Sequence, residues 1–475
     1  MPRQRTVSRR ALLSGLGGAA AVTALSAAGC GQALLPTPTA APKPTAPATT
    51  AAPAQPNPAP TAAAATPTAQ PKAGTKAATI RINARADIVQ DFLDEFGKEY
   101  EQAHPGITIV QEGIPSAEYF VKLRALSASK QIGDIVWGFI SGGAWLAFAP
   151  LGVLRPLDDL VKAEGADFLK QWYAPAIEIG KLDGKLYGLP EMSHPGNVVF
   201  MVNEDTFAEA GVSLPTTEWD FEKDLVPAAQ KLTKRSGDRV DRFGTYVENA
   251  YLGLVPMLRR WGGELLNPDG TKCLLDSPEN AKAVQFMVDL VTKHKVVPGQ
   301  QQIEESSTKM VLAGKLASIA NTTAGTLATN RAAASGKMKL SGRLTPKGPA
   351  GFGSMLAAQQ MGVYTGSQVV EPAWDLIKFY TSHDVGVRKV VKASPGGRPD
   401  VYHDPRLYKI DPIYELLVPV MDKLQPHILP NNLRGAEMTK VLDNEMQSIW
   451  LGKVDVATGL KNAQAEVQKV LDQPR

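Results

Sequence analysis

The stretch that decides the fold is TIRINARADIVQDFLDEFGKEYEQAHPGITIV, residues 79–110. Residues 79–83 alternate apolar and polar side chains, as a half-buried strand does. Ile88, Phe92, Phe96 and Tyr100 then recur every four residues, which is typical of one face of a helix. Pro105 cannot continue a helical hydrogen-bond ladder, and residues 107–110 read as a second strand. The stretch therefore predicts a β–α–β unit.

The same alternation continues outward from this unit. Residues 116–129 predict an amphipathic helix and residues 134–139 a buried strand. Further helices are expected at 204–210, 219–233, 277–293, 371–382, 412–422, 435–449 and 457–472. Alternating strands and helices favour a mostly parallel sheet that is covered on both faces. Because ligands of such sheets bind beyond the carboxyl ends of the strands, the loops near Arg85, Glu112–Ser116 and Ser141–Trp145 are the first candidates for a site.

Charge is unevenly distributed along the 475 residues. The chain has a net charge of +4, but its first 77 residues hold seven basic and no acidic residues, which leaves the rest at −3. A near-neutral body argues against nucleic-acid binding, which needs a basic face to displace counterions. The composition is otherwise that of an ordinary globular protein, with 44% hydrophobic residues.

The N-terminus has the pattern of an export signal. Four arginines precede an uncharged run, residues 11–29, that is rich in Ala and Gly, and Cys30 follows. Ser8–Leu13 resembles the twin-arginine export motif, and Ala27–Cys30 resembles the lipobox at which lipoproteins are cut and acylated. The run is poor in the Leu, Ile, Phe and Val that favour a permanent membrane span. The sequence therefore predicts a signal peptide at 1–29 and a lipidated Cys30.

Residues 30–77 predict a disordered tether. Residues 31–77 contain eleven prolines among Ala and Thr, with no aromatic and no acidic residue. Such a segment cannot bury enough apolar surface to offset the entropy of ordering it. The other cysteine, Cys273, lies in an apolar run, so we expect a small buried residue rather than half of a disulfide.

The body resembles a known family in several motifs that occur in the family's order. The family is that of the extracellular solute-binding proteins of bacterial ABC transporters, family 1, which includes maltose- and oligosaccharide-binding members. The motifs that carry the resemblance are Phe96–Tyr100 with His104–Ile107, Tyr119–Leu123 with Asp134–Val136, Leu151–Asp158, Asp183–Pro190, Val202–Phe207, Ala210-Gly211, Thr217–Trp219, Gly262–Leu266 and Ala373–Phe379. Together they span roughly residues 78–472.

The resemblance implies a two-lobed α/β fold of the periplasmic-binding-protein type II class, with a hinge and an interlobe cleft. Lobe one would hold 78–191 plus 349–383, and lobe two 192–348 plus 384–475. It further implies an extracytoplasmic protein that closes around a small solute, with a mono- or oligosaccharide as the expected class, and hands it to the permease subunits of an importer. No cofactor, metal or nucleic acid is implied, and no chemistry on the solute.

Candidate solute contacts follow from what a sugar offers, which is hydroxyl groups and C–H faces. Polar groups bond the hydroxyls and planar rings stack on the faces. Arg85 follows the first strand, and Glu191 and His194 lie at the first predicted crossing between lobes. Trp137, Trp145, Tyr246, Tyr251 and Trp261 are the candidate aromatic walls. Asn321 lies in a small, polar stretch where the family often has an aromatic residue, and Arg398 lies in a late Pro/Gly-rich crossing loop. For Trp374 and Trp450 the spacing favours core positions.

Three other readings stay open at this point. The solute could be a polyol, sugar phosphate, peptide or polyamine. An exported polysaccharide-cleaving enzyme would need a pair of carboxylates, and no catalytic signature singles one out. A surface adhesion or structural domain is the third reading.

Overall fold

The computed structural model describes residues 77–139, 145–303, 306–423 and 433–473. The predicted signal peptide and nearly all of the predicted tether, with Cys30, lie outside the described residues, as does most of the loop 141–145. None of the helices within the described ranges combines the length and apolar character needed to span a bilayer.

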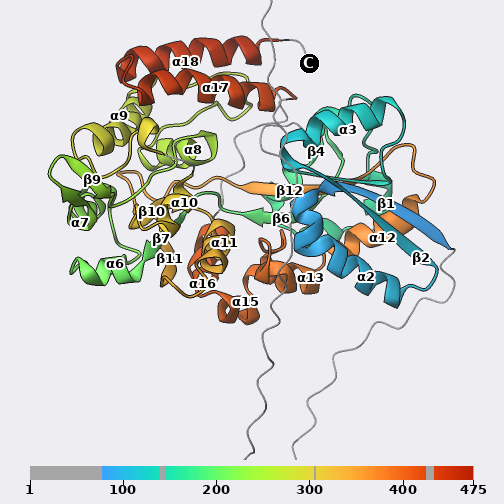
Figure 1. Cartoon of the computed structure of the whole chain (residues 1–475). Coiled ribbons are helices and arrows are strands. Elements are labelled where there is room, and N and C mark those ends of the chain that lie inside the picture. Colours follow the sequence, from blue (N-terminus) through green and yellow to red (C-terminus); the bar gives the residue numbers. More distant parts are fainter. Residues whose placement is uncertain (1–76, 140–144, 304–305, 424–432, 474–475) are drawn as a thin grey trace, which may run out of the picture. The chain divides into compact units, whose positions relative to one another are not determined.

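The first sheet has five strands in the order β2–β1–β3–β12–β6 (Figure 1). Its strands are β1 (Ala78–Arg85), β2 (Ile107–Ile114), β3 (Ile135–Phe139), β6 (Leu189–His194) and β12 (Ala357–Val363). The pairs β1–β2 and β1–β3 are parallel, as the β–α–β pattern predicts, whereas β12 pairs antiparallel with both β3 and β6. The sequence pattern did not predict the two antiparallel pairings. Strands β6 and β12 come from segments more than 50 residues beyond the first unit, and local periodicity carries no information on such distant pairing.

Helices α2 (Asp94–Ala103), α3 (Tyr119–Ala128) and α12 (Val370–Tyr380) supply buried side chains to the core around this sheet. The smaller elements of this part are α1 (Ala86–Ile88), α4 (Asp158–Glu164), α5 (Ala174–Glu178) and the hairpin β4 (Lys181–Leu182) to β5 (Lys185–Leu186). A π-helical stretch, Val89–Leu93, joins α1 to α2. The predicted helix at 88–100 is therefore confirmed, with a local irregularity in its first turns.

The second sheet has three antiparallel strands in the order β10–β7–β11, which corrects the expectation of parallel strands for the later segments. The strands are β7 (Val199–Asn203), β10 (Ser318–Thr322) and β11 (Leu340–Leu344), and a small hairpin joins β8 (Lys234–Ser236) to β9 (Arg239–Arg242). All five residues of β7 are buried, so its continuous apolar run marks it as the central strand.

Six of the helices whose buried residues belong to the core of the second sheet lie at predicted positions. They are α6 (Glu204–Glu209), α7 (Val226–Leu232), α9 (Pro278–Thr292), α16 (Ile413–Met421), α17 (Gly435–Trp450) and α18 (Val456–Leu471). Five others were not predicted, namely α8 (Tyr251–Arg260), α10 (Ser307–Leu312), α11 (Ala324–Ala334), α14 (Pro399–Tyr402) and α15 (Pro405–Ile410). Their ends have sequence causes: α9, for example, begins after Ser277, whose side chain accepts a hydrogen bond from the Asn280 N–H. Helices α17 and α18 lie side by side (Figure 1).

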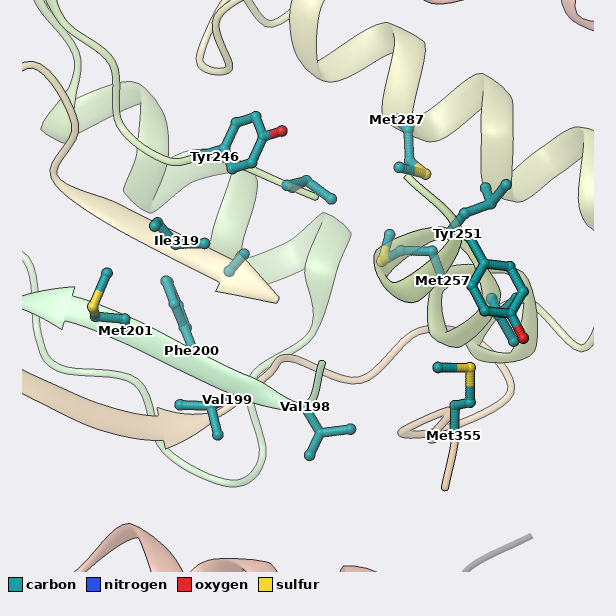
Figure 2. Packing of buried hydrophobic residues seen from close by; sticks show 14 of the residues in the cluster. Val198, Val199, Phe200, Met201, Tyr246, Tyr251, Met257, Met287, Ile319 and Met355 are labelled. Carbon is teal, nitrogen blue, oxygen red and sulfur yellow. The ribbon is translucent and has the colours of Figure 1, made fainter. Parts of the chain in front are cut away.

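Two separate clusters of buried apolar residues form around the two sheets. Figure 2 shows part of the second cluster, with Met201 of β7 near Ile319 of β10 and Tyr251 and Met257 on α8. Leu189 belongs to the first cluster and Val198 to the second. In α13 (His383–Arg388), Val385 belongs to the first cluster and Val387 to the second. Within β12, Ala358 belongs to the second cluster and Met361 to the first. Tyr173, Ala176 and Ile179 also belong to the second cluster, although first-cluster residues precede and follow them along the chain. Several passages of the chain therefore link the two clusters.

Candidate functional site

One pocket in the described part of the chain has a volume of about 660 Å³, which is enough for a small organic solute. Phe120, on α3 beside the first sheet, lines it together with side chains from the part of the chain around the second sheet. Its full lining consists of Phe120, Asn197, Glu248, Ala250, Tyr251, Leu252, Ser307, Thr308, Ile319, Asn321, Thr322, Thr323, Thr326, Ala436, Thr439 and Asp443. We call this cavity the polar pocket, because most of these residues carry neutral groups that can donate or accept hydrogen bonds.

Asn321 forms the base of the polar pocket at the end of β10. The side chain is fully buried, and its Oδ1 accepts from the Glu248 N–H at 2.6 Å while its Nδ2 donates to the Glu248 carbonyl at 3.0 Å. The amide thus pairs with the backbone of Glu248 as a neighbouring strand would, next to the parallel bridge between Tyr246 and Ile319. It fixes the segment that leads into α8.

Two carboxylates lie where α8 begins. One oxygen of Glu248 accepts from the N–H groups of Asn249 and Ala250, at 3.0 and 3.1 Å. Asp443, on α17, accepts from the Tyr251 N–H at 2.9 Å. Burial, reinforced by the charge of Glu248, raises the pKa of Asp443. Both acidic residues also line the polar pocket.

Hydroxyl groups make up much of the remaining wall. Thr323 caps α11 by accepting from the Thr326 N–H, and the two threonine hydroxyls also bond each other at 3.0 Å. Thr439 donates to the Gly435 carbonyl within α17. Such hydroxyls are held in place by the helices that carry them, so the pocket is largely preformed.

Two of the ten sequence-predicted solute contacts, Tyr251 and Asn321, line the polar pocket. Tyr246 is buried and borders a different, smaller cavity, together with Trp450 and helix α9 residues. Its hydroxyl is close to Glu248, and burial together with that carboxylate raises the pKa of Tyr246. Trp450 is only partly buried, whereas Trp374 is buried as predicted.

Arg85, Trp137 and Glu191 come together around the first sheet. Trp137 is fully buried and donates its Nε1–H to Glu191 at 3.2 Å, and the Arg85 guanidinium lies 5.8 Å from the Trp137 ring centre. Glu191 is also buried and forms an ion pair with Lys389, whose ammonium donates to the Glu191 carbonyl at 2.8 Å. Burial lowers the pKa of Lys389 well below its ordinary value. These side chains form a connected interior cluster, so the structure places Trp137 and Glu191 in the core rather than on an open wall.

Trp145 and Trp261 are also core residues. Trp145 is fully buried in a slot between glycines, since a Cβ at Gly138, Gly188 or Gly362 would meet its indole ring within 2.8 Å. Trp261 packs against Phe286 with ring centres 4.8 Å apart. In both cases neighbouring groups cover the ring, which leaves no open face on which a sugar could stack.

His194 and Arg398 lie apart from the polar pocket. His194, at the end of β6, borders a small separate cavity and accepts from the Gly196 N–H at 3.1 Å. Burial lowers the pKa of His194 to about 4. Arg398 pairs with Asp400, bonds Gln171 at 2.8 Å and lies 5.3 Å from the ring centre of Trp172.

Sequence reasoning missed Phe120, Glu248 and Asp443 as pocket residues. Glu248 had one usable signal, because an acidic residue near the start of a helix is stabilised by the helix dipole, and Glu248 lies three residues before α8. Phe120 sits at the start of a predicted helix that follows a strand, which is where the fold class places ligands. Asp443 offers no local signal, since its bond to Tyr251 spans 192 residues.

Two further expectations from the sequence have clear outcomes. Glu112–Ile114 is not loop but the end of β2, which corrects the expected candidate loop there. Cys273 is confirmed as a buried residue, and burial raises the pKa of its thiol to about 11.

Metal binding has no support in the described part of the chain, where no group of three or more His, Cys, Asp or Glu side chains could hold an ion. The lining of the polar pocket offers hydroxyl, amide, carboxylate and aromatic groups.

Comparisons with known proteins place this geometry in context. Proteins of Brucella abortus and Brucella suis named as binding proteins are 25% identical over 389 residues, which is 80% of this chain and 90% of theirs. The arabinooligosaccharide-binding protein of Halalkalibacterium halodurans is 31% identical over 142 residues, 29% of this chain and 30% of that one.

Solved structures share the fold. An ABC substrate-binding protein of Listeria monocytogenes in complex with cycloalternan has a TM-score of 0.72 and 21% identity, covering 83% of this chain and 99% of that one. An ABC transporter solute-binding protein of Thermotoga lettingae bound with α-D-tagatose has a TM-score of 0.70 and 24% identity, covering 84% and 100%. The fold of this chain is accordingly the two-lobed fold of periplasmic solute-binding proteins.

The family model of the bacterial extracellular solute-binding proteins matches residues 85–387, which is more than half of the chain. The chain, with its two α/β cores, therefore belongs to the family of bacterial extracellular solute-binding proteins.

Proposed function

We propose that the protein captures a sugar or a similar polyhydroxylated solute in the polar pocket and delivers it to the permease of an ABC importer. The observation that carries the proposal is the lining itself: hydroxyl and amide groups suit a hydroxylated guest, and Phe120 and Tyr251 are the aromatic residues among them. The sugar ligands named for structural neighbours, cycloalternan and tagatose, support the same class. Ribitol in an Agrobacterium radiobacter neighbour supports polyols as the second candidate.

The two lobes of the proposal are residues 78–191 plus 349–383 and residues 192–348 plus 384–475. The passages of the chain between the two apolar clusters, near 189–198, 358–361 and 385–387, support these boundaries. A solute that contacts both lobes shifts a two-state hinge equilibrium towards closure through contacts made only in the closed form. We infer capture without chemistry, because the family and its structural neighbours are binding proteins.

A thermal-shift screen of the purified protein against sugars, polyols, amines and peptides tests the proposal. A ligand that binds only the native state stabilises it, by about 2.7 kcal/mol at a hundredfold excess over Kd. We expect sugars or polyols to raise the melting temperature. Leu252→Trp should abolish the shift because Leu252 is an exposed side chain that lines the pocket, whereas Leu451→Trp, exposed elsewhere, should retain it.

Two outcomes would overturn the proposal. A shift that survives Leu252→Trp would place the solute elsewhere, and a shift with peptides alone would exclude the sugar class. Release of a product from an oligosaccharide by the protein would instead favour the exported enzyme.

The export and anchoring predictions complete the proposal. A twin-arginine signal at residues 1–29, a lipid on Cys30 and a Pro-rich tether at 30–77 would hold the binding domain outside the cell, near the permease. Cys30→Ser should move the protein from the membrane fraction to the soluble fraction, while Cys273→Ala should leave it membrane-bound. Membrane retention of Cys30→Ser would exclude the lipid anchor.

A further inference from the structure

The polar pocket carries two carboxylates and no basic side chain among its described lining residues. Glu248 and Asp443 are the two acids, and every other lining residue is uncharged. They come from separate elements, the segment before α8 and the middle of α17, so the fold brings them to one cavity. The sign of the pocket's charge is thus a property of its tertiary structure.

The helix N-terminus that would attract an anion is already occupied. Free N–H groups at the start of a helix bind phosphate and carboxylate groups readily. At α8 the N–H groups of Asn249 and Ala250 donate to Glu248, and that of Tyr251 donates to Asp443. A phosphorylated solute would have to displace these internal carboxylates.

Helix N-termini at the pocket oppose the charge of the two carboxylates. A helix N-terminus is equivalent to about +0.5 of an elementary charge. Four helices of ten or more residues, α3, α8, α11 and α17, begin at the pocket, and their partial positive charges oppose the two carboxylates. Each partial charge falls off within the first turn, and at α8 the N–H groups at the helix start already bond the two carboxylates. The start of α11 is also capped by the Thr323 hydroxyl, which uses the Thr326 N–H.

This arrangement changes the pKa of Asp443. Burial and, to a smaller extent, the charge of Glu248 raise the pKa of Asp443, so its ionised form is held at a cost in free energy. A positive group placed in the pocket would relieve that cost, and a second negative group would increase it. The two carboxylates therefore favour a positively charged group in the pocket over a negatively charged one.

We propose that the polar pocket selects its solute by charge, taking a sugar or polyol that bears a protonated amine and rejecting the phosphorylated counterpart. The proposal rests on the proposed function, because it assigns the solute class of that same pocket. The hydroxyl and amide groups would bind the solute's hydroxyls, and the outer oxygens of Glu248 and Asp443 would accept from its ammonium.

Matched sugars test this selection by isothermal titration calorimetry of the purified protein. The triples are glucosamine, glucose and glucose 6-phosphate, then galactosamine, galactose and galactose 6-phosphate, with the chitosan disaccharide against cellobiose as a larger pair. We expect each amine to bind about tenfold or more tighter than its neutral parent, and the phosphates to bind more weakly than either. Equal or tighter binding of a phosphate would overturn the proposal, as would failure of every amine to bind.

Asp443→Asn separates charge from structure. An asparagine Oδ1 can still accept from the Tyr251 N–H, so the start of α8 keeps its cap while the negative charge is lost. We expect the ratio of amine affinity to neutral-parent affinity to fall about tenfold. Glu437→Gln, an exposed position on the same helix outside the pocket lining, should leave the order of affinities unchanged.

The outcome also distinguishes this inference from the proposed function. Neutral sugars that bind, with binding lost in Leu252→Trp, would uphold the sugar-binding function even if amine, parent and phosphate bound alike, and only the charge selection would then fail. If no sugar or polyol bound, both would fail.

Discussion

At the scale of single residues, the most consequential group that the sequence did not single out is Lys389. Its side chain and that of Glu191 are both buried, and they pair where the chain passes between its two apolar cores. Removing one partner of a buried pair leaves an uncompensated polar or charged group, which costs about 3–5 kcal/mol. Lys389→Met should therefore lower the free energy of unfolding by that amount in urea titrations.

Two further variants identify the cause of that loss. Lys392→Met breaks an exposed pair with Glu95 and should cost no more than about 1 kcal/mol. Adding Glu191→Gln to Lys389→Met removes the unpaired carboxylate while keeping an acceptor for the Trp137 Nε1–H, so it should recover part of the loss. A double variant as unstable as the sum of the single changes would show that the two side chains are not coupled.

His194 makes stability depend on pH at the end of β6. Its pKa is lowered to about 4 by burial, against an ordinary value of 6.5, so between these values the unfolded chain binds more protons than the native one. The contribution of the neutral ring is complete above about pH 6.5 and is lost as pH falls towards 4. Because the ring is partly exposed, we expect a loss of about 2 kcal/mol between pH 7 and pH 4.5.

The difference between wild type and His194→Asn isolates this effect from other titrations. Asparagine can accept from the Gly196 N–H without titrating. Urea titrations at pH 7 and pH 4.5 should show a larger loss of unfolding free energy in wild type than in His194→Asn. An equal loss of unfolding free energy in the two proteins would mean that His194 has the same pKa in the native and the unfolded chain.

At the scale of elements, the glycines of β3, β12 and the segment before β6 leave the space that Trp145 fills. A Cβ at Gly362 would lie 2.8 Å from the indole and 2.5 Å from the Tyr187 carbonyl oxygen. Overpacking of this kind costs about 1–3 kcal/mol or more, so Gly362→Ala should lower the free energy of unfolding by at least that amount. The cost should shrink in a Trp145→Phe background, where the smaller ring leaves room.

Gly299→Ala is the matched control. Its φ is −68° and the nearest atoms to an added Cβ are at 3.5 and 3.6 Å, so the change should stay within about 0.5 kcal/mol. If Gly362→Ala cost the same in the wild-type and Trp145→Phe backgrounds, the strain would lie at the Tyr187 backbone alone.

Elements with local signals were predictable from the sequence, and those formed by distant pairing were not. The helix spacing of Phe92, Phe96 and Tyr100 is confirmed in the first core. The antiparallel sheet instead pairs Val199–Asn203 with Leu340–Leu344, about 140 residues apart, and no periodicity encodes that register. For the site, Asn321 was singled out from the sequence as a polar residue, and the structure places it in the lining of the polar pocket. Tryptophans misled because a large ring is as typical of a core as of a sugar-binding wall.

At the scale of the whole molecule, the two apolar cores explain why one chain can both be stable and move. Each core buries its own side chains, and several passages of chain connect them, so a hinge motion can change the pocket without exposing either core. Phe120 is the described pocket residue that comes from the first core's elements, while the rest of the lining comes from 197–443. A solute held by both halves must therefore contact Phe120.

Phe120→Ala tests that requirement directly. Losing the burial of one aromatic face against the solute should weaken Kd about tenfold, with a smaller change in stability, since the ring is only partly buried where it contacts Tyr119. Val121→Ala, at the next position of α3 and 74% exposed, should bind as wild type does. Calorimetry gives Kd, and small-angle scattering gives the contraction that the solute induces. An unchanged Kd in Phe120→Ala would mean that one half alone grips the solute, because closure then adds no contact from the other half and has no free energy to drive it.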